Sequence, residues 1–311
     1  MSCIICLTSA NAERACSCTA LACRGCLLEI LDRGKERCVV CGSRWHPLAV
    51  VHACLSGLEG PTTNQDQAKA YVKLAVAYSA AEDPRRALRS LAIAQHLVEP
   101  ESRWAHFIAV ETGQNLLAIG HIDDAERCLR GVMPRLLQLP RRAPSGVLFA
   151  ACCILMCKAN SRKEKCGPAR AWLRRALNIQ ADLGLEVPLA TSLQLDANLL
   201  MREGKYHIAK KTLQSAERIL SRVETDECLK AGLQLQIADV ETKLGERGSA
   251  RTRVAALLPM LRRRKHEHFG ADLLPTAACA MSKLVNPSRR LRRKTCPECV
   301  EHRESQTASQ P

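Results

Sequence analysis

The residues of this chain best suited to chemistry are eight cysteines within the first 41 positions. They form three CxxC pairs and one CxC pair: Cys3, Cys6, Cys16, Cys18, Cys23, Cys26, Cys38 and Cys41. The first ten residues do not have the pattern of a secretory signal, so a reducing compartment is expected, where disulfides are rare. Three CxxC pairs also exceed what one redox motif needs. Eight thiolates match two tetrahedral Zn²⁺ ions, which we therefore predict as cofactors.

A metal would also explain how so short a segment folds. It has little apolar surface, and ligand binding can supply the missing free energy of folding. His46 and His52 follow the cysteines, but Trp45, Leu48, Val51 and Leu55 recur at helical spacing around them. The histidines are therefore interpreted as surface or partly buried residues of a helix that caps the zinc module, rather than as ligands.

The order of the cysteine pairs resembles a RING finger in its RING-variant (RING-CH) form. The resemblance implies that alternate pairs share an ion. One zinc would be held by Cys3, Cys6, Cys23 and Cys26, and the other by Cys16, Cys18, Cys38 and Cys41. It departs from the family at Cys23, where histidine is usual, and at Val39, where proline is common.

The same resemblance implies an activity. RING-type ligases perform no covalent chemistry themselves; they hold a ubiquitin-conjugating enzyme in a productive pose. Ile5 keeps the apolar character of the docking surface. Leu27, directly after Cys26, is a residue usual in the family at that place, whereas Ile30 stands where the family has an aromatic residue. A conjugating enzyme is thus an expected partner, with Ile5, Leu27 and Ile30 as its contacts and no catalytic residue in the chain.

Composition indicates that the remaining chain is helical. The sequence has 311 residues, of which 47% are hydrophobic and only 3% aromatic, which favours packed helices over a β-sandwich. Its longest apolar stretch, residues 147–157, is shorter than the roughly 18 residues of a membrane span. A polar, turn-rich segment at 57–66 suggests a boundary. We expect a zinc module with its capping helix at 1–56, helical repeats at 67–285, and a basic tail at 286–311.

One pattern recurs five times in the body of the chain. An alanine is followed by apolar residues four and seven positions later, one face of a helix. These anchor alanines, spaced 38, 44, 40 and 41 residues apart, are Ala87, Ala125, Ala169, Ala209 and Ala250. Gly120, Gly204 and Gly245 stand five residues before their anchors, where a tight turn needs a small residue. In the third copy, the basic segment KANSRKEKCGP is predicted to lengthen the turn.

A near-constant period predicts a repeat array. It resembles the tetratricopeptide repeat, with the roughly 40-residue unit of kinesin-light-chain-like arrays. The resemblance implies a mainly α fold, an α–α superhelix of about five helix pairs behind the small two-zinc module. The first helices of the pairs would line a groove for a peptide or protein, presenting Lys69, Val76, Gln114, Leu117, Gln194, Asn198, Met201 and Asp239. Equally, any of these residues could belong to a solvated helix face.

Charge is concentrated near the C-terminus. Of the net charge of +15, residues 251–294 contribute 12 Lys/Arg against 2 Asp/Glu. The basic run Arg289 to Lys294 suits nuclear import or contact with an acidic surface. Cys296, Cys299 and His302 supply three metal ligands, but a disordered tail with incidental thiols is the expected reading. Specific nucleic-acid binding is disfavoured because aromatic residues for stacking are scarce.

Two functions follow from these patterns, and no phosphate loop, GxSxG or HExxH motif adds a third. In one, the chain is a ubiquitin ligase whose zinc module recruits the conjugating enzyme while the repeats select a protein substrate. In the other, it is a non-enzymatic adaptor with a structural zinc module. Gln114, Gln194 and Asn198 are the predicted partner contacts in the repeats. Either protein would be cytoplasmic or nuclear and would bind no membrane.

Overall fold

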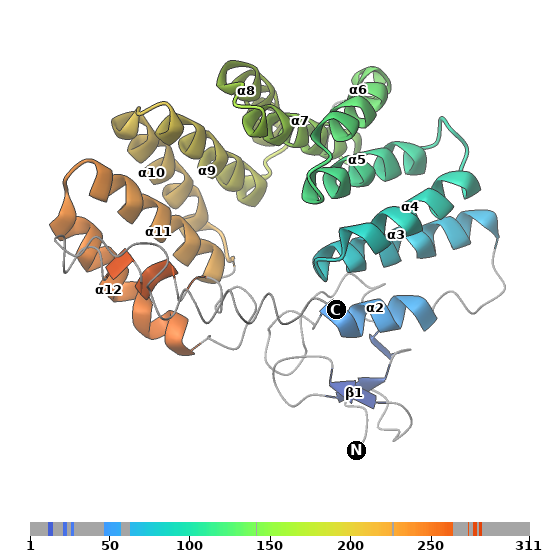
Figure 1. The fold of residues 1–311 in the computed structure, drawn as a ribbon, viewed down its shortest axis with the longest axis horizontal. Helices are drawn as coiled ribbons and strands as arrows, with labels where there is room; N and C mark the ends of the chain where they lie inside the picture. The colour runs from blue at the N-terminus through green and yellow to red at the C-terminus, as the bar shows by residue number, and fades with distance from the viewer. Residues whose placement is uncertain are drawn as a thin grey trace. The chain divides into compact units, whose positions relative to one another are not determined.

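The computed structural model describes residues 12–14, 21–23, 26–27, 47–56, 63–140, 142–225, 227–263 and, near the C-terminus, 273, 276–278 and 280–281. Its labelled elements are β1 (Ala12–Arg14), β2 (Leu21–Cys23), α2 (Pro47–Ser56), α3 (Asn64–Ala80), α4 (Pro84–Leu97), α5 (Arg103–Ala118), α6 (Ile122–Gln138), α7 (Ser145–Arg162), α8 (Cys166–Asp182), α9 (Glu186–Arg202), α10 (Tyr206–Arg222), α11 (Glu227–Lys243) and α12 (Arg247–Arg263) (Figure 1). The predicted helical body is confirmed between α3 and α12.

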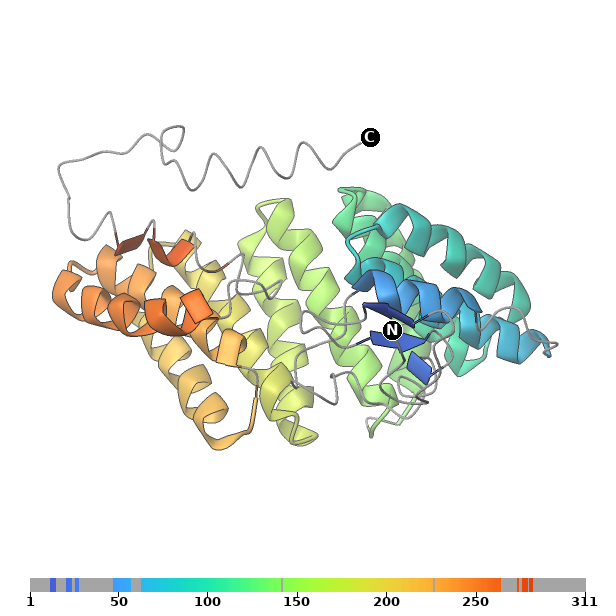
Figure 2. The same cartoon turned by 90° about the horizontal axis from the view of Figure 1, so that it is seen from below.

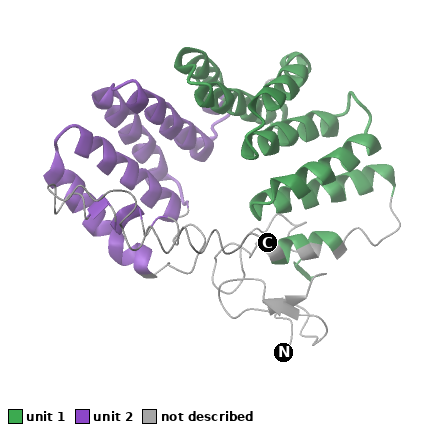
Figure 3. Cartoon of the chain, in the orientation of Figure 1, with its two compact units in different colours: residues 1–179 green, residues 180–311 purple. Residues whose placement is uncertain are grey.

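The chain divides into two compact units, Met1–Ile179 and Gln180–Pro311 (Figure 3). In the first unit, β1 pairs antiparallel with β2, with Glu13 opposite Ala22. The helices of both units form hairpins: α3 lies against α4, α5 against α6, α9 against α10 and α11 against α12 (Figure 2). We refer to α3, α5, α7, α9 and α11 as first helices, and to α4, α6, α8, α10 and α12 as second helices.

Each hairpin turn contains three residues, and the middle residue has a positive φ. The predicted Gly120, Gly204 and Gly245 have φ values of 88°, 74° and 83°. Glu82 and Glu164 occupy the same place in the other two hairpins, with φ values of 59° and 60°. Glycine adopts this conformation without steric cost, whereas a residue with a Cβ does not. The backbone geometry of the turn is therefore the same in all five hairpins, although the middle residue differs.

This uniform turn corrects the expectation for the third copy. The segment KANSRKEKCGP does not lengthen the turn, because residues up to Arg162 continue α7 and α8 begins at Cys166. Only Lys163, Glu164 and Lys165 remain between the helices. The Lys165 amide donates to the Asn160 carbonyl at 2.9 Å, the bond that Lys205 makes with Leu200 in the next hairpin. The extra residues of this copy lie elsewhere in the repeat.

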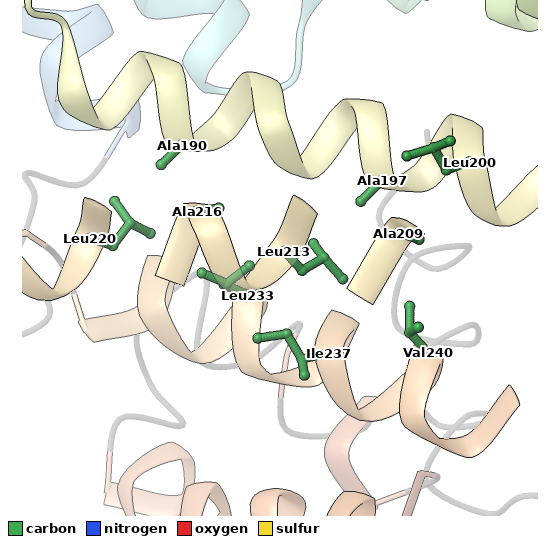
Figure 4. Close-up of a cluster of buried hydrophobic side chains, with 10 residues drawn as sticks. All are labelled: Ala190, Ala197, Leu200, Ala209, Leu213, Ala216, Leu220, Leu233, Ile237 and Val240. Atoms are coloured by element: carbon green, nitrogen blue, oxygen red, sulfur yellow. The ribbon is translucent and has the colours of Figure 1, made fainter. Parts of the chain in front are cut away.

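The anchor alanines hold the hairpins together. All five are fully buried, and so are the residues four positions later: Leu91, Leu129, Leu173, Leu213 and Val254. In the second unit, Ala209 and Leu213 of α10 lie between Ala197 of α9 and Ile237 of α11 (Figure 4). The small anchor lets two helices approach closely, while the leucine fills the space beside it. The predicted repeat pattern is confirmed as the core of the array.

The helix α2 packs against the repeats. Its Val51 and Cys54 form a cluster with Leu74 and Ala77 of α3. Leu55, predicted on the same apolar face, is instead 41% exposed, because the buried face runs through Val51 and Cys54. A capping role of α2 toward the cysteine segment stays a prediction. Within the described helices, none is long and apolar enough to cross a membrane.

Candidate protein-binding face

The first helices carry a row of solvent-accessible side chains at one place in the repeat, eleven residues before each anchor alanine. We call these equivalent positions the first-helix face of each unit: Val76, Gln114 and Lys158 in the first unit, and Asn198 and Asp239 in the second. Asn198 is half-buried, and the other four are exposed. The residues that follow them directly in the sequence (Ala77, Asn115, Ala159, Leu199 and Val240) are all buried. One helix position therefore faces solvent while its neighbour faces the core.

Sequence reasoning located four members of this face and missed Lys158. Val76, Gln114, Asn198 and Asp239 were predicted there, and the structure places each at the surface or half-buried. Lys158 follows the apolar run of α7, whose residues are hydrophobic on every side of the helix and so give no amphipathic signal. Counting back eleven residues from Ala169 would have found it.

Other predicted groove residues lie outside this row. Leu117 is buried, at 3% exposure, and its assignment to the groove was wrong. Ser79, at the equivalent position in α3, bonds to Asn115 of the next first helix, and the Leu117 carbonyl likewise accepts from Arg162 of α7. Met201 is partly buried against the α9–α11 core, and Lys69 and Gln194 are half-buried. Hence fewer of the predicted groove residues are accessible to solvent than the sequence suggested.

A hydrogen bond fixes the register between the first helices of the first unit. The Ser79 hydroxyl donates to Asn115 Oδ1 at 2.8 Å, and Asn115 Nδ2 donates to the Glu111 carbonyl at 2.9 Å. Both polar side-chain atoms of Asn115 are thus bonded inside the structure. One turn before this contact lies the Glu111 side chain, whose carboxyl pKa is raised by desolvation. The α3–α5 seam therefore combines an ordered polar contact with a partly buried carboxylate.

Ion pairs hold α7 to α6 at the other side of the first unit. Lys163 Nζ lies 2.6 Å from Asp123 Oδ1 and also pairs with Glu126, while the Arg162 guanidinium donates to the Leu117 carbonyl. Lys163, and then Arg130, hold the pKa of Glu126 below its usual range. The acidic residues at the start of α6 are therefore neutralised by cations at the end of α7. These residues hold the two helices together and do not belong to the first-helix face.

A buried polar network stabilises the second unit, and no sequence signal revealed it. Glu241 of α11, at 1% exposure, accepts from Arg253 of α12 at 3.3 Å and 3.4 Å. Lys210 of α10 lies 3.7 Å from the same carboxylate, and Arg253 also reaches Glu217 at 3.3 Å. A buried carboxylate needs such partners, because an unpaired one is strongly destabilising. The network binds three consecutive helices together.

The predicted zinc ligands lie mostly outside the described residues. Of the eight, the structure describes only the backbone of Cys23, within β2, and the half-buried Cys26. Leu27 is 2% exposed, so its side chain is buried in the structure, while Ile5 and Ile30 are not among the described positions. The described part of the chain holds no cluster of three or more His, Cys, Asp or Glu suited to a metal. Cys296, Cys299, His302 and the side chains of His46 and His52 also fall outside it.

The cysteines of the repeats are core residues. Cys54, Cys152, Cys153, Cys157 and Cys228 are buried, and Cys128 is half-buried. Burial raises the pKa of Cys152 and of Cys153 to about 12. A thiol with so high a pKa is protonated at neutral pH and is a poor nucleophile or ligand. These cysteines therefore fill space rather than perform chemistry.

Comparison with known proteins supports the fold. Neither a protein-family model nor a curated protein matches the chain. Among solved structures, it is similar to a kinesin-light-chain-type protein from Podosopora anserina with nearly identical TPR-like repeats. That match has 17% identity and a TM-score of 0.53, and it covers 66% of this chain and 99% of that one.

Two of the similar structures are complexes. NprR in complex with its cognate peptide NprX has 13% identity and a TM-score of 0.59, over 93% of this chain and 82% of that one. A Rap protein complexed with Competence and Sporulation Factor has 15% identity and a TM-score of 0.55, over 79% of this chain and 70% of that one. At these identities the likeness establishes the fold alone. This chain is a mainly α protein built of tetratricopeptide-like helix pairs.

Proposed function

We propose that this protein is a non-enzymatic binding protein whose first-helix face recognises a polypeptide. The observation that carries the proposal is the chemistry of that face. Its five positions present an apolar side chain, two amides, a cation and an anion: Val76, Gln114, Asn198, Lys158 and Asp239. The adjoining core positions are apolar except Asn115, which is hydrogen-bonded through both polar side-chain atoms. A face that varies on a constant scaffold is suited to sequence-specific recognition.

The similar structures support the class of ligand. NprR carries a peptide in its structure, and its helical repeats resemble those of this chain over most of its length. An extended peptide offers backbone groups that Gln114 and Asn198 can bind through their amides. The buried thiols of Cys152 and Cys153 have pKa values raised to about 12 and so are poor nucleophiles at neutral pH. Binding therefore explains the face better than catalysis.

Peptide selection followed by mutation tests the proposal. A peptide library is selected on the intact protein, and the affinity of the enriched peptides is measured for Gln114→Ala, Asn198→Ala and the control Leu137→Ala. Leu137 is exposed on the second helix α6. We expect the two first-helix variants to weaken binding by about tenfold each, which corresponds to about 1.4 kcal/mol. Equal affinities for all variants, or no enriched peptide, would contradict the proposal.

We further propose that the N-terminal cysteines hold two zinc ions and make this segment a structural module. The ligand count and spacing support this, with Cys3, Cys6, Cys16 and Cys18 in the first half of the motif and Cys23, Cys26, Cys38 and Cys41 in the second. Ligase activity is the second candidate, because the pairs follow a cross-brace order. It would require a docking surface around Ile5. Incubation with activating enzyme, conjugating enzymes, ubiquitin and ATP tests it: chains that form with the wild type and not with Ile5→Ala would support a ligase.

A further inference from the structure

A half-buried carboxylate lies beside the first-helix face of the first unit. Glu111 of α5 stands three residues before Gln114, on the same side of the helix. Gln114 is exposed, whereas Glu111 is half-buried. The helices α3 and α7 both contact α5. Glu111 is therefore close to the surface proposed to bind a peptide, but it is partly withdrawn from water.

Among the buried and half-buried carboxylates that the structure describes, Glu111 alone has no partner. Asp196 has one, and five others pair with a lysine or arginine: Asp83 with Arg86, Glu126 with Lys163, Glu203 with Lys205, and Glu217 and Glu241 with Arg253. Neither Lys73 of α3 nor Lys158 of α7 pairs with Glu111, although both lie on neighbouring first helices. Desolvation therefore raises the pKa of the Glu111 carboxyl, and no cation of the described chain lowers it.

The fold does not need a carboxylate at this position. A carboxylate that is withdrawn from water and has no partner destabilises the folded state. The equivalent places, fourteen residues before the other four anchor alanines, hold no acidic residue: Lys73, Leu155, Leu195 and Gln236. An exposed carboxylate such as Asp239 stays hydrated and needs no partner. A cation supplied by a ligand therefore explains Glu111 better than a role in folding does.

We propose that Glu111 selects a basic residue, lysine or arginine, in the peptide bound by the first-helix face of the first unit. This inference rests on the function proposed above and names the chemistry of its ligand. The Cβ atoms of residues three positions apart on a helix are about 5–6 Å apart. Gln114 can therefore bind the peptide backbone while the long basic side chain of the same peptide residue reaches Glu111.

The partial burial of Glu111 makes it better suited to this role than a fully exposed carboxylate. Charge-assisted hydrogen bonds are stronger than neutral ones, and a pair partly withdrawn from water is stronger than one at the surface. Much of the desolvation of Glu111 has already taken place in the folded, unbound protein. Less of the interaction energy is therefore lost when the cation binds, as for any preorganised site.

Peptide selection with an N-acetylated library tests the inference on the intact protein, because no N-terminal ammonium group can then contribute. The wild type should enrich lysine or arginine at one peptide position. The charge-reversed Glu111→Lys should enrich aspartate or glutamate there instead. The control Glu99→Lys makes the same change at an exposed position outside the helices and should keep the wild-type preference.

Affinity measurements with neutral variants complete the test. One enriched peptide is compared with a counterpart in which methionine replaces the basic residue. Glu111→Gln should bind the basic peptide about tenfold more weakly and the methionine counterpart within about twofold of the wild type, whereas Glu99→Gln should change neither. The melting temperature of Glu111→Gln should be unchanged or higher, because an unpaired carboxylate is removed.

Three results would overturn this inference alone. Enriched peptides that depend on Gln114 but show no preference for a basic residue would leave the proposed function intact and exclude this role of Glu111. Equal weakening by Glu111→Gln and Glu99→Gln would show that only net charge matters. A lower melting temperature of Glu111→Gln would assign the carboxylate to the fold. If the wild type enriched no peptide, both the proposed function and this inference would be contradicted.

Discussion

Gly113 of α5 and Leu129 of α6 are in direct contact across their hairpin: a Cβ added to Gly113 would lie 2.7 Å from Leu129 Cδ2 and 2.8 Å from its Cγ. Leu129 is fully buried and has little room to move. The same place in the other first helices, twelve residues before the anchor, holds a small residue throughout: Ala75, Cys157, Ala197 and Ala238. Close approach of the two helices therefore depends on this position as well as on the anchor alanine.

The first prediction compares two glycines. Gly131 of α6 has open space around it, so Gly131→Ala should stabilise the protein by about 1 kcal/mol through helix propensity alone. Gly113→Ala gains the same propensity but must displace Leu129, and overpacking costs about 1–3 kcal/mol. Chemical denaturation should therefore find Gly113→Ala less stable than Gly131→Ala. Equal stability of the two variants would show that Leu129 moves aside without measurable cost.

The second prediction concerns the turns with a glutamate of positive φ. A residue with a Cβ costs about 1–2 kcal/mol in this conformation, and glycine removes the cost. Glu164→Gly should raise the free energy of unfolding by about 1 kcal/mol, after allowance for glycine's larger unfolded-state entropy. Gly204→Ala, at the equivalent turn, should lower it by a similar amount. Thermal unfolding of both variants checks the pair, and a destabilised Glu164→Gly would mean that its side chain has a structural role.

The sequence made the repeats predictable because their signal is local. The Ala–Leu spacing on one helix face persists in all five copies, and glycine marks three of the five turns. Glu82 and Glu164 escaped notice because glutamate is not a turn former; only the fixed distance of five residues from the anchor identifies them. Glu241 and Arg253 escaped because their bond joins two helices through space and has no characteristic spacing.

The binding face was predictable only in part. Val76, Gln114, Asn198 and Asp239 were found from their position in the motif. Leu117 was misassigned because it is buried in the structure, and burial by neighbouring helices cannot be read from the pattern of its own helix. The zinc ligands are a different case: their spacing is informative, but most lie outside the described residues, so their prediction still rests on sequence.

The third prediction is a pH dependence. His106 is 5% exposed, and neither ring nitrogen has a hydrogen-bond partner among the described residues. Desolvation, and then the nearby Arg135, lowers its pKa from the model-peptide value of 6.5. The unfolded chain therefore binds the proton more readily, and stability falls as the pH drops below about 6.5 toward the lower folded pKa.

The measurement is the free energy of unfolding between about pH 7.5 and 5 for the wild type and His106→Leu. Replacement of His106 by leucine should flatten the dependence, while the exposed His207→Gln serves as the control and should leave it as in the wild type. An identical slope in the wild type and His106→Leu would assign the pH dependence to other groups.

The fourth prediction is metal content. Eight thiolates at the observed spacing should bind two zinc ions per chain. Metal analysis of the purified protein measures this directly, and Cys38→Ser should lose one ion because it removes one ligand. Chelation should unfold the N-terminal segment while the helical repeats keep their circular dichroism, since the described helices hold no group of His, Cys, Asp or Glu that could bind a metal ion. Less than one zinc per chain, with all 18 cysteines titrating as thiols, would refute the zinc module.

Photo-crosslinking tests the central claim, peptide recognition by the first-helix face, most directly. A photoreactive amino acid is placed at Gln114, at Asn198 or, as control, at the exposed Leu137 of α6, and each protein is irradiated with a selected peptide. We predict crosslinks from positions 114 and 198, suppressed by excess unlabelled peptide, and none from position 137. Crosslinking from position 137 alone, with none from the first helices, would contradict the claim.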